Sequence, residues 1–204
     1  MNMNDRVILE QLKQTAWDDL QYFSNTNKPA RERWVVAQFL KALSVPHLEG
    51  DLRSLEIKNK VDVQFREAAF QVKELTDPDL RRGQMYKNAY KSTKVAKRLE
   101  EVSLIGPLIS DPPIASMYDL VVNLAQKLSE GNEYGEEASS IDLLVYITRR
   151  RAALLQSEEV DQSAFSGFGW RSVSCVNSKQ AAVLYASDTA PDFIWAHSQE
   201  IRSI

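Results

Sequence analysis

Three polar side chains in one short segment are of the chemical types that bind a metal ion beside a phosphodiester. The segment reads VDVQFREAAFQVKEL over residues 61–75 and predicts two short strands that pair around Arg66–Ala69. Asp62 lies on the first strand, and Gln71 and Lys73 lie on the second. If the strands pair back to back, a carboxylate, an amide oxygen and an ammonium share one polar face. Such oxygens are ligands that Mg²⁺ accepts, and an ammonium stabilises charge on a phosphate.

The apolar residues of this segment predict how the two strands align. They alternate with polar residues on both strands and comprise Val63 and Phe65, then Phe70 and Val72. A turn of two or four residues would pair these apolar residues across one face, so that Asp62 lies opposite Lys73 with Gln71 on the diagonal. A turn of three residues would reverse this relation. An amphipathic hairpin whose polar face is simply solvated is the alternative.

A fourth candidate ligand lies on a helix that precedes the hairpin. A proline suited to the first helical turn and apolar residues at helical spacing predict this helix over residues 29–43. Glu32 shares its apolar stripe with Val35, Val36 and Phe39. A carboxylate on a buried stripe needs a partner, and a metal ion would be one. Stabilisation of the helix dipole, or an ion pair with a neighbouring arginine, is the alternative role of Glu32.

A basic helix follows the hairpin. Asp77 as N-cap and Pro78 in the first turn predict a helix that extends to about Val102. Its polar and basic residues could contact a phosphate backbone, and the predicted nucleic-acid contacts are Arg81, Arg82, Gln84, Lys87, Lys91 and Lys94. Tyr86 and Tyr90 stand beside them, where a ring could stack on an unpaired base. A lysine-rich face that is only solvated fits the same pattern.

Size and composition are those of one ordinary globular domain. The chain has 204 residues, a hydrophobic share of 44%, one cysteine and a net charge of −3, with acid concentrated in residues 130–137 and 157–161. One cysteine excludes an internal disulfide. Without a signal-peptide pattern or an apolar stretch of membrane-spanning length, we expect a cytoplasmic protein with no membrane partner. Neither histidine has ligands at metal-binding spacing, so a zinc site is not expected.

The segments between these motifs predict helices and strands in alternation. Helices are expected over residues 5–23 and, with Asp111 as the cap, over residues 113–128. A strand buried on both faces is expected over residues 141–148, because this segment is short, apolar and β-branched. Asp142 begins this strand and is assigned no role.

The C-terminal part predicts two closing strands and a last helix. The strands are expected near residues 169–176 and 180–187, and residues 189–192 resemble a capping box that opens a helix through residue 201. The fold class is therefore α/β, with a mixed sheet flanked by helices. We expect a single domain, 1–204, that consists of an N-terminal helical extension (1–28), a core (29–148) and C-terminal strands and helix (149–204).

The residues just described carry a resemblance to known proteins. RERWVVAQFLKAL together with VDVQFREAAFQVKELTDP resembles a bacterial family labelled putative endonucleases. The order helix, three strands, helix, strand is similar to the core of the PD-(D/E)xK nuclease superfamily, over roughly Pro29 to Thr148. The resemblance implies a restriction-endonuclease-like mixed sheet with an extra N-terminal helix.

The resemblance also implies roles for the candidate residues. Asp62 would be the principal metal ligand, Gln71 the second ligand, and Lys73 would position the attacking water. Glu32 would complete the metal shell around Mg²⁺ or Mn²⁺, and DNA would be the substrate. Gln71 departs from the Asp or Glu that is common in the superfamily. Loss of that negative charge predicts weaker Mg²⁺ binding or a preference for Mn²⁺.

Two other functions fit the same sequence. The first is a catalytically inactive module that keeps the nuclease fold and binds nucleic acid or a protein partner, which Gln71 and the acidic net charge favour. The second is a structural or oligomeric protein that uses the tryptophan-bearing C-terminal region. The sequence assigns no oligomeric state.

Overall fold

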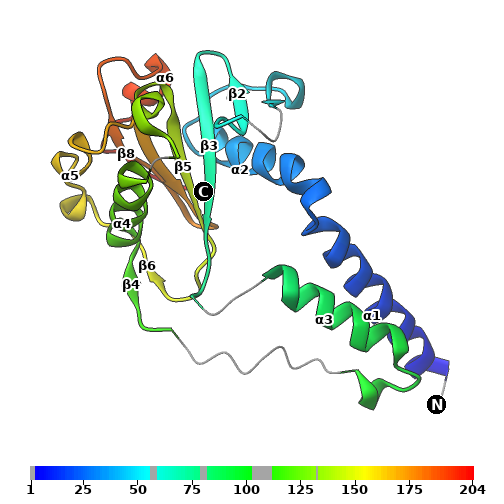
Figure 1. The fold of residues 1–204 in the computed structure, drawn as a ribbon. Helices are drawn as coiled ribbons and strands as arrows, with labels where there is room; N and C mark the ends of the chain where they lie inside the picture. The colour runs from blue at the N-terminus through cyan, green and yellow to red at the C-terminus, as the bar shows by residue number, and fades with distance from the viewer. Residues whose placement is uncertain (1–2, 56–58, 79–81, 103–111, 132) are drawn as a thin grey trace. The chain divides into compact units, whose positions relative to one another are not determined.

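The computed structural model describes residues 3–55, 59–78, 82–102, 112–131 and 133–204 (Figure 1). The chain divides into two compact units. A helical unit comprises Met1–Lys28 and Pro78–Asp111, and a sheet unit comprises Pro29–Asp77 and Pro112–Ile204. Residues 1–28, predicted as an N-terminal extension, thus group with a segment from the middle of the chain.

The helical unit is built on two helices that lie side by side, α1 (Met3–Tyr22) and α3 (Arg82–Val95) (Figure 1). Two short 3₁₀ helices, η1 (Asn25–Asn27) and η3 (Leu99–Glu101), follow them in the chain. Aromatic rings join the two helices: Trp17 contacts Tyr90 with ring centroids 5.3 Å apart, and Phe23 stacks on Tyr86 at 4.2 Å. Both tyrosines predicted to stack on bases therefore pack within the unit.

The basic helix is shorter than predicted. It ends at Val95 rather than near Val102. The hydroxyls of Ser92 and Thr93 both donate to the Ala89 carbonyl, at 2.9 and 2.7 Å, and such side-chain bonds compete with the helical backbone.

The predicted cap of the basic helix has a different partner. Asp77 is buried and accepts hydrogen bonds from the backbone N–H of Arg150 at 3.1 Å and from its Nε at 2.7 Å. This carboxylate thereby ties the end of one strand to the end of its neighbour, and the prediction of Asp77 as a helix cap was wrong.

The sheet unit contains a seven-stranded mixed sheet within the described residues. The strand order is β1-β2-β3-β5-β7-β8-β9. The pairs β3–β5 and β5–β7 are parallel, and the other pairs are antiparallel. The strands are β1 (Arg53–Ser54), β2 (Val63–Phe65), β3 (Ala68–Leu75), β5 (Asp142–Ile147), β7 (Ser172–Val176), β8 (Gln180–Ala186) and β9 (Ile201–Ser203), and a separate two-stranded sheet pairs β4 (Ala115–Ser116) with β6 (Ala152–Ala153).

Helices cover both faces of the large sheet, which confirms the predicted mixed sheet flanked by helices (Figure 1). On one face, α2 (Lys28–Ala42) buries Val36, Phe39 and Leu40 in a cluster that includes Phe70, Val72 and Leu144. On the other face, α4 (Met117–Glu130) buries Met117, Val121 and Ala125 with Leu143 and Val145. The shorter helices of the unit are η2 (Glu49–Asp51), η4 (Gly135–Ser140), η5 (Ser157–Glu159), α5 (Ser163–Ser166) and α6 (Asp192–Trp195).

The predicted cap of α4 and the predicted C-terminal helix need correction. Asp111 lies outside the described residues, and Ser116 caps α4 by accepting the N–H of Tyr118 at 3.1 Å. The C-terminal helix α6 has only four residues, and its N-cap Pro191 makes no side-chain cap hydrogen bond. The capping box at residues 189–192 was thus wrong. The chain turns at Gln199, which has a φ of 65°, and returns as β9.

One buried ion pair joins three strands at their N-terminal ends. Asp142 is 1% exposed and accepts from the backbone N–H of Ala69 at 2.9 Å, from Ser172 Oγ at 2.8 Å and from Arg171 Nε at 3.0 Å. Nη2 of Arg171 bonds to the same carboxylate and also to the Glu67 carbonyl, at 3.1 Å from the carbonyl oxygen. Burial raises the pKa of Asp142, and these donors oppose the rise.

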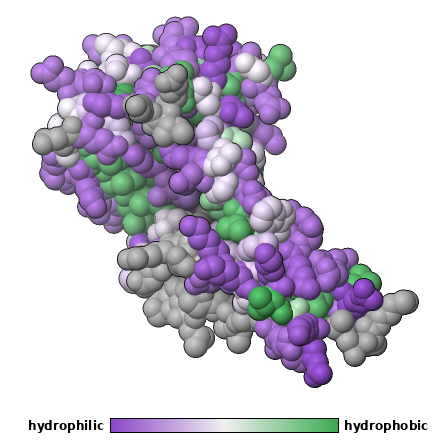
Figure 2. All heavy atoms as spheres, turned by 45° about the vertical axis from the view of Figure 1, so that its right-hand side comes forward, coloured by the Kyte–Doolittle hydropathy of each residue, from purple (hydrophilic) through white to green (hydrophobic). Residues whose placement is uncertain are grey.

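No helix in the described ranges combines the length and the apolar character that crossing a bilayer demands. Figure 2 shows hydrophilic residues over most of one face, with hydrophobic residues in separate small groups.

Arg171→Met is expected to lower the free energy of unfolding by about 3–5 kcal/mol, because it leaves the Asp142 carboxylate buried without its cation. Urea denaturation measures the loss. Arg202→Met is the matched control, since Arg202 pairs with Glu200 at the surface and exposed pairs contribute little. Equal losses in the two variants would contradict the role given to Arg171.

Cys175 is expected to resist thiol reagents in the folded protein. The thiol is buried on β7, and burial raises its pKa to about 12. At pH 8 its thiolate fraction is then roughly 1,000-fold smaller than that of an unfolded cysteine. Because the folded pKa is raised, this group favours unfolding as pH rises above about 9. Alkylation at pH 8 with and without urea measures the difference, and fast reaction of the native thiol would contradict it.

Candidate functional site

The hairpin pairs in a register two residues away from the predicted one. Phe65 lies opposite Ala68, so the turn consists of Arg66 and Glu67 alone. Arg66 has a φ of 50°, in the left-handed region that tight hairpin turns use. The two phenylalanines that were expected to pair instead contact other rings: Phe65 meets Phe193 with centroids 5.6 Å apart, and Phe70 meets Phe39 at 6.0 Å.

The observed register, with Val63 opposite Phe70, brings the Asp62 side chain to Gln71 rather than to Lys73, so the prediction that Asp62 lies opposite Lys73 was wrong. The backbone holds Asp62 in place. Its N–H donates to the Phe70 carbonyl at 2.8 Å, and its Oδ2 accepts from the N–H of Val72 at 2.9 Å. Nε2 of Gln71, which is buried, donates to the same Oδ2. Asp62 and Gln71 are therefore in direct contact.

Gln71 presents its amide nitrogen, not its oxygen, to Asp62. Metal ions bind the amide oxygen, so Gln71 must rotate its amide to act as a ligand. The donor set nevertheless suits a hard divalent cation, because it joins one carboxylate to one amide. No cluster of three or more His, Cys, Asp or Glu side chains that could hold a metal occurs among the residues described. A metal here would accordingly depend on Gln71 and on water.

Lys73 points toward the α4 side of the sheet. It pairs with Val145 of β5, whose side chain belongs to the core under α4. Its Nζ lies 5.3 Å from the ring centroid of Tyr134 and 3.7 Å from Oε1 of Glu133. The sequence did not single out these two neighbours, because residues 130–137 were noted only as an acidic run.

Tyr134, the aromatic neighbour of Lys73, is buried and packed against another ring. Its side chain is 1% exposed, and its ring lies 5.0 Å from that of Trp170. Trp170 in turn donates from Nε1 to the Ala125 carbonyl at 3.0 Å. Burial, followed by the negative charge of Glu133, raises the pKa of Tyr134. Glu133 and Asp62 act on the phenol electrostatically, and the Glu133 carboxylate lies within reach of its hydroxyl. No group in the described part of the chain, however, has full hydrogen-bond geometry to that hydroxyl.

Glu32 occupies a different side of the sheet. It is buried on α2, whose apolar residues pack on the face that carries Phe70 and Val72. Side chains alternate along a strand, so Gln71 and Lys73 point to the opposite face. The described contacts include no hydrogen bond or ion pair between Glu32 and either of these residues. The metal role of Glu32 therefore stays a prediction.

The predicted nucleic-acid contacts belong to the helical unit. Lys87, Lys91 and Lys94 are exposed on α3, and Nζ of Lys94 lies 5.6 Å from the ring centroid of Tyr90. Arg81 lies outside the described residues, as do the side chains of Arg82 and Gln84. Three exposed lysines on one helix are able to contact a phosphate backbone.

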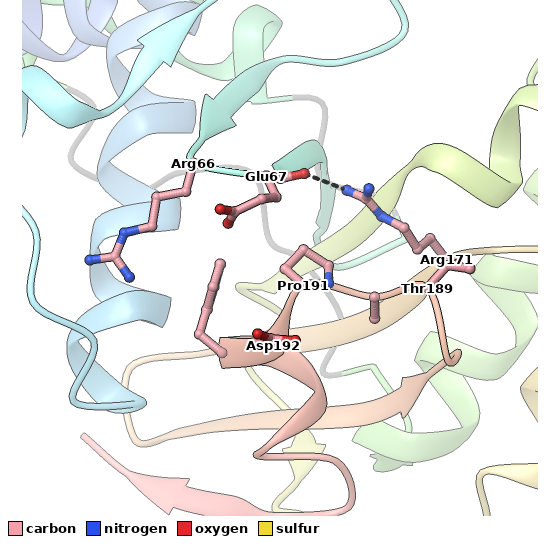
Figure 3. Close-up of a pocket in the computed structure, with 8 residues that line it drawn as sticks. Arg66, Glu67, Arg171, Thr189, Pro191 and Asp192 are labelled. Carbon is pink, nitrogen blue, oxygen red and sulfur yellow. Dashed lines mark hydrogen bonds between the residues drawn. The ribbon is translucent and has the colours of Figure 1, made fainter.

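A pocket of about 430 Å³ lies at the tip of the hairpin (Figure 3). Its lining includes the turn residues Arg66 and Glu67, together with Arg171 and Asp192. Figure 3 shows the hydrogen bond from Arg171 to the Glu67 carbonyl at its rim. Arg171 already serves Asp142, and the pocket carries charges of both signs. Asp62, Gln71 and Lys73 do not line it.

Comparisons with known proteins give a family and one similar fold. Residues 4–203 match the model of a family described as "Putative endonuclease, protein of unknown function (DUF1780)". A solved structure from Pseudomonas aeruginosa strain PAO1, described as a protein of unknown function in the monooxygenase superfamily, is 25% identical. The similarity covers 99% of this chain and 97% of that chain, with a TM-score of 0.58. The comparison with curated proteins gives no match.

Gln71→Glu is expected to strengthen binding of Mn²⁺ about tenfold or more, because it adds a negative charge beside Asp62. Isothermal titration measures the affinity. Gln64→Glu adds the same charge to the same hairpin and is the control, since Gln64 bonds to the Arg66 carbonyl. If both variants change the affinity equally, Gln71 is not a ligand position.

Proposed function

Since the chain belongs to this family of putative endonucleases, we propose that it is a metal-dependent endonuclease that hydrolyses DNA phosphodiester bonds. The observation that carries the proposal is the direct contact between Asp62 and Gln71, with Lys73 on the same face of the hairpin. A carboxylate, an amide and an ammonium at adjacent positions match the chemistry of metal-assisted phosphoryl transfer. The family description supports a nuclease in general.

The order of elements supports a restriction-endonuclease-like fold of the PD-(D/E)xK type. In the sheet unit, α2 is followed by β1, β2 and β3, then by the two-residue strand β4, by α4 and by β5. Apart from β4, which belongs to the small sheet, this is the helix, three strands, helix, strand order of that superfamily. Asp62 precedes β2, and Gln71 and Lys73 lie on β3, which are the positions that the resemblance assigns to the site.

Each residue of the hairpin has a definite part in the proposed reaction. When bound, Mg²⁺ or Mn²⁺ would activate a water molecule and neutralise charge on the phosphate. Asp62 offers a carboxylate that the Val72 N–H holds through Oδ2, while its own backbone N–H donates to the Phe70 carbonyl. Gln71 offers an amide oxygen after rotation. Lys73 holds an ammonium beside them, where it can orient a nucleophile or stabilise a phosphate oxygen.

The exposed lysines of α3 would contact the DNA backbone. Lys87, Lys91 and Lys94 provide charge without base recognition, so binding would depend on salt more than on sequence. The acidic net charge of the chain, −3, disfavours non-specific attraction of DNA to the whole surface, so a local cluster of lysines has to provide the contact.

A second candidate is a binding module without catalysis. The hydrogen bond from Gln71 to Asp62 favours it, because the amide already satisfies the carboxylate without a cation. Such a module would bind DNA in the presence of a chelator and would cleave nothing.

Lys73→Ala is expected to reduce cleavage of supercoiled plasmid and of single-stranded DNA by about 100-fold or more in Mg²⁺ or Mn²⁺, because it removes the ammonium beside Asp62. Gel assays of nicked, linear and shortened products measure the rate. The control is Lys60→Ala, because the described ion pair of Lys60, at 2.8 Å, is with Glu137 of the same acidic run and not with Asp62.

Absence of cleavage by the wild type with either metal would reject the nuclease. Retained DNA binding in a chelator would then favour the inactive module. Equal cleavage by the wild type and Lys73→Ala would show that any activity arises elsewhere.

A further inference from the structure

The surroundings of Lys73 contain a donor that has no acceptor. The Tyr134 hydroxyl is buried and unpartnered within the described residues. A buried hydroxyl without a hydrogen bond costs stability, so such a donor in a native protein is completed by an ordered water, an ion or a ligand, or has a functional role. This donor belongs to the ring beside which the Lys73 ammonium lies.

Glu133 is near both groups, because its carboxylate pairs with Lys73 and acts on the Tyr134 phenol. Its Oε1 lies 3.7 Å from Lys73 Nζ, which is an ion-pair distance but beyond hydrogen-bond length. Its side chain is 62% exposed, whereas that of Lys73 is 28% exposed. An exposed pair of this kind contributes little stability, so the carboxylate is readily displaced.

We propose that Lys73 and Tyr134 form an anion slot for a non-bridging phosphate oxygen of a nucleic-acid backbone, and that Glu133 fills this slot as a displaceable latch in the free protein. The proposal rests on the proposed nuclease function and extends it to two residues and to regulation of the same site. A phosphate oxygen can accept from both the ammonium and the phenol, whereas the Glu133 carboxylate lies 3.7 Å from the ammonium and is poorly aligned with the phenol.

The architecture allows Glu133 to move while Tyr134 stays. Tyr134 is held by the Trp170 ring at 5.0 Å, and Trp170 is bonded to the backbone of α4. Glu137, in the same acidic run, is tied to Lys60 at 2.8 Å, so this part of the run has its own anchor. Displacement of Glu133 therefore requires a side-chain rotation and no change in the fold.

The latch also explains how an acidic site admits an anion. Asp62 and Glu133 both repel a phosphate, and only Lys73 attracts it within this group. Removal of the Glu133 carboxylate from the slot leaves one negative charge fewer beside the ammonium. Binding is thus selective for a ligand that offers better geometry than a carboxylate.

The test uses the full-length protein, a chelator and a thymidine dinucleotide that carries one phosphodiester, followed by ³¹P NMR titration. Glu133→Gln should tighten binding about two- to fivefold, because it removes a weak competitor. Tyr134→Phe should weaken binding about tenfold or more, because it removes one donor to a charged acceptor. Lys73→Ala should abolish it. Glu137→Gln, the matched control, should bind as the wild type does.

Thermal unfolding shows whether the Tyr134 hydroxyl acts on the ligand or instead stabilises the fold. Tyr134→Phe removes no well-formed hydrogen bond from the free protein, so its melting temperature should stay close to that of the wild type. A lower melting temperature with unchanged dinucleotide affinity would assign the hydroxyl to the fold and overturn the slot. No dinucleotide binding by the wild type, or equal effects of Glu133→Gln and Glu137→Gln, would also overturn it.

These results are independent of cleavage. If the dinucleotide binds with the expected variant effects but no DNA is cleaved with Mg²⁺ or Mn²⁺, the anion slot is supported and the nuclease function is rejected. If Lys73→Ala abolishes cleavage while Glu133→Gln and Tyr134→Phe leave the dinucleotide affinity unchanged, the nuclease stands and the slot is rejected.

Discussion

The buried contact between Asp142 and Arg171 is the constraint on which the sheet unit depends. Asp142 begins β5, its carboxylate accepts from the first residues of β3 and β7, and Arg171 bonds also to the turn of the hairpin. One carboxylate thus aligns the parallel strands and fixes the hairpin that carries Asp62. A charge this deeply buried is tolerated only because several donors surround it.

The candidate site follows from placing a polar strand face in a sheet that is covered on both sides. On β3, Phe70 and Val72 enter the core under α2, and alternation sends Gln71 and Lys73 toward α4. Polar groups in such a position need partners. Gln71 finds Asp62, and Lys73 finds the ring of Tyr134 and the carboxylate of Glu133. The need of these buried polar side chains for partners therefore also brings together groups that can bind a metal ion and a phosphate.

Gln71 gives this arrangement two possible states. With its amide nitrogen toward Asp62, the pair is self-sufficient and requires no cation. With the amide rotated, it offers an oxygen to a metal ion. Since the amide lacks the charge of Asp or Glu, the balance between the states depends on the supply of metal more than it would in a site with two carboxylates. Metal binding would therefore require the Gln71 amide to rotate away from its hydrogen bond with Asp62.

Local pattern in the sequence determined the elements and the faces. Alternation of apolar and polar residues over 61–75 placed Asp62, Gln71 and Lys73 on one face, and the short apolar run near 141–148 was a strand buried on both sides. Tertiary structure decided the register, because Phe65 and Phe70 found ring partners on α6 and α2 instead of each other. It also decided that the C-terminal segment pairs with β8, and that Glu133 and Tyr134 meet Lys73 from sixty residues away along the chain. A local pattern reports which side of a strand is buried; only packing between distant segments decides which partner covers it.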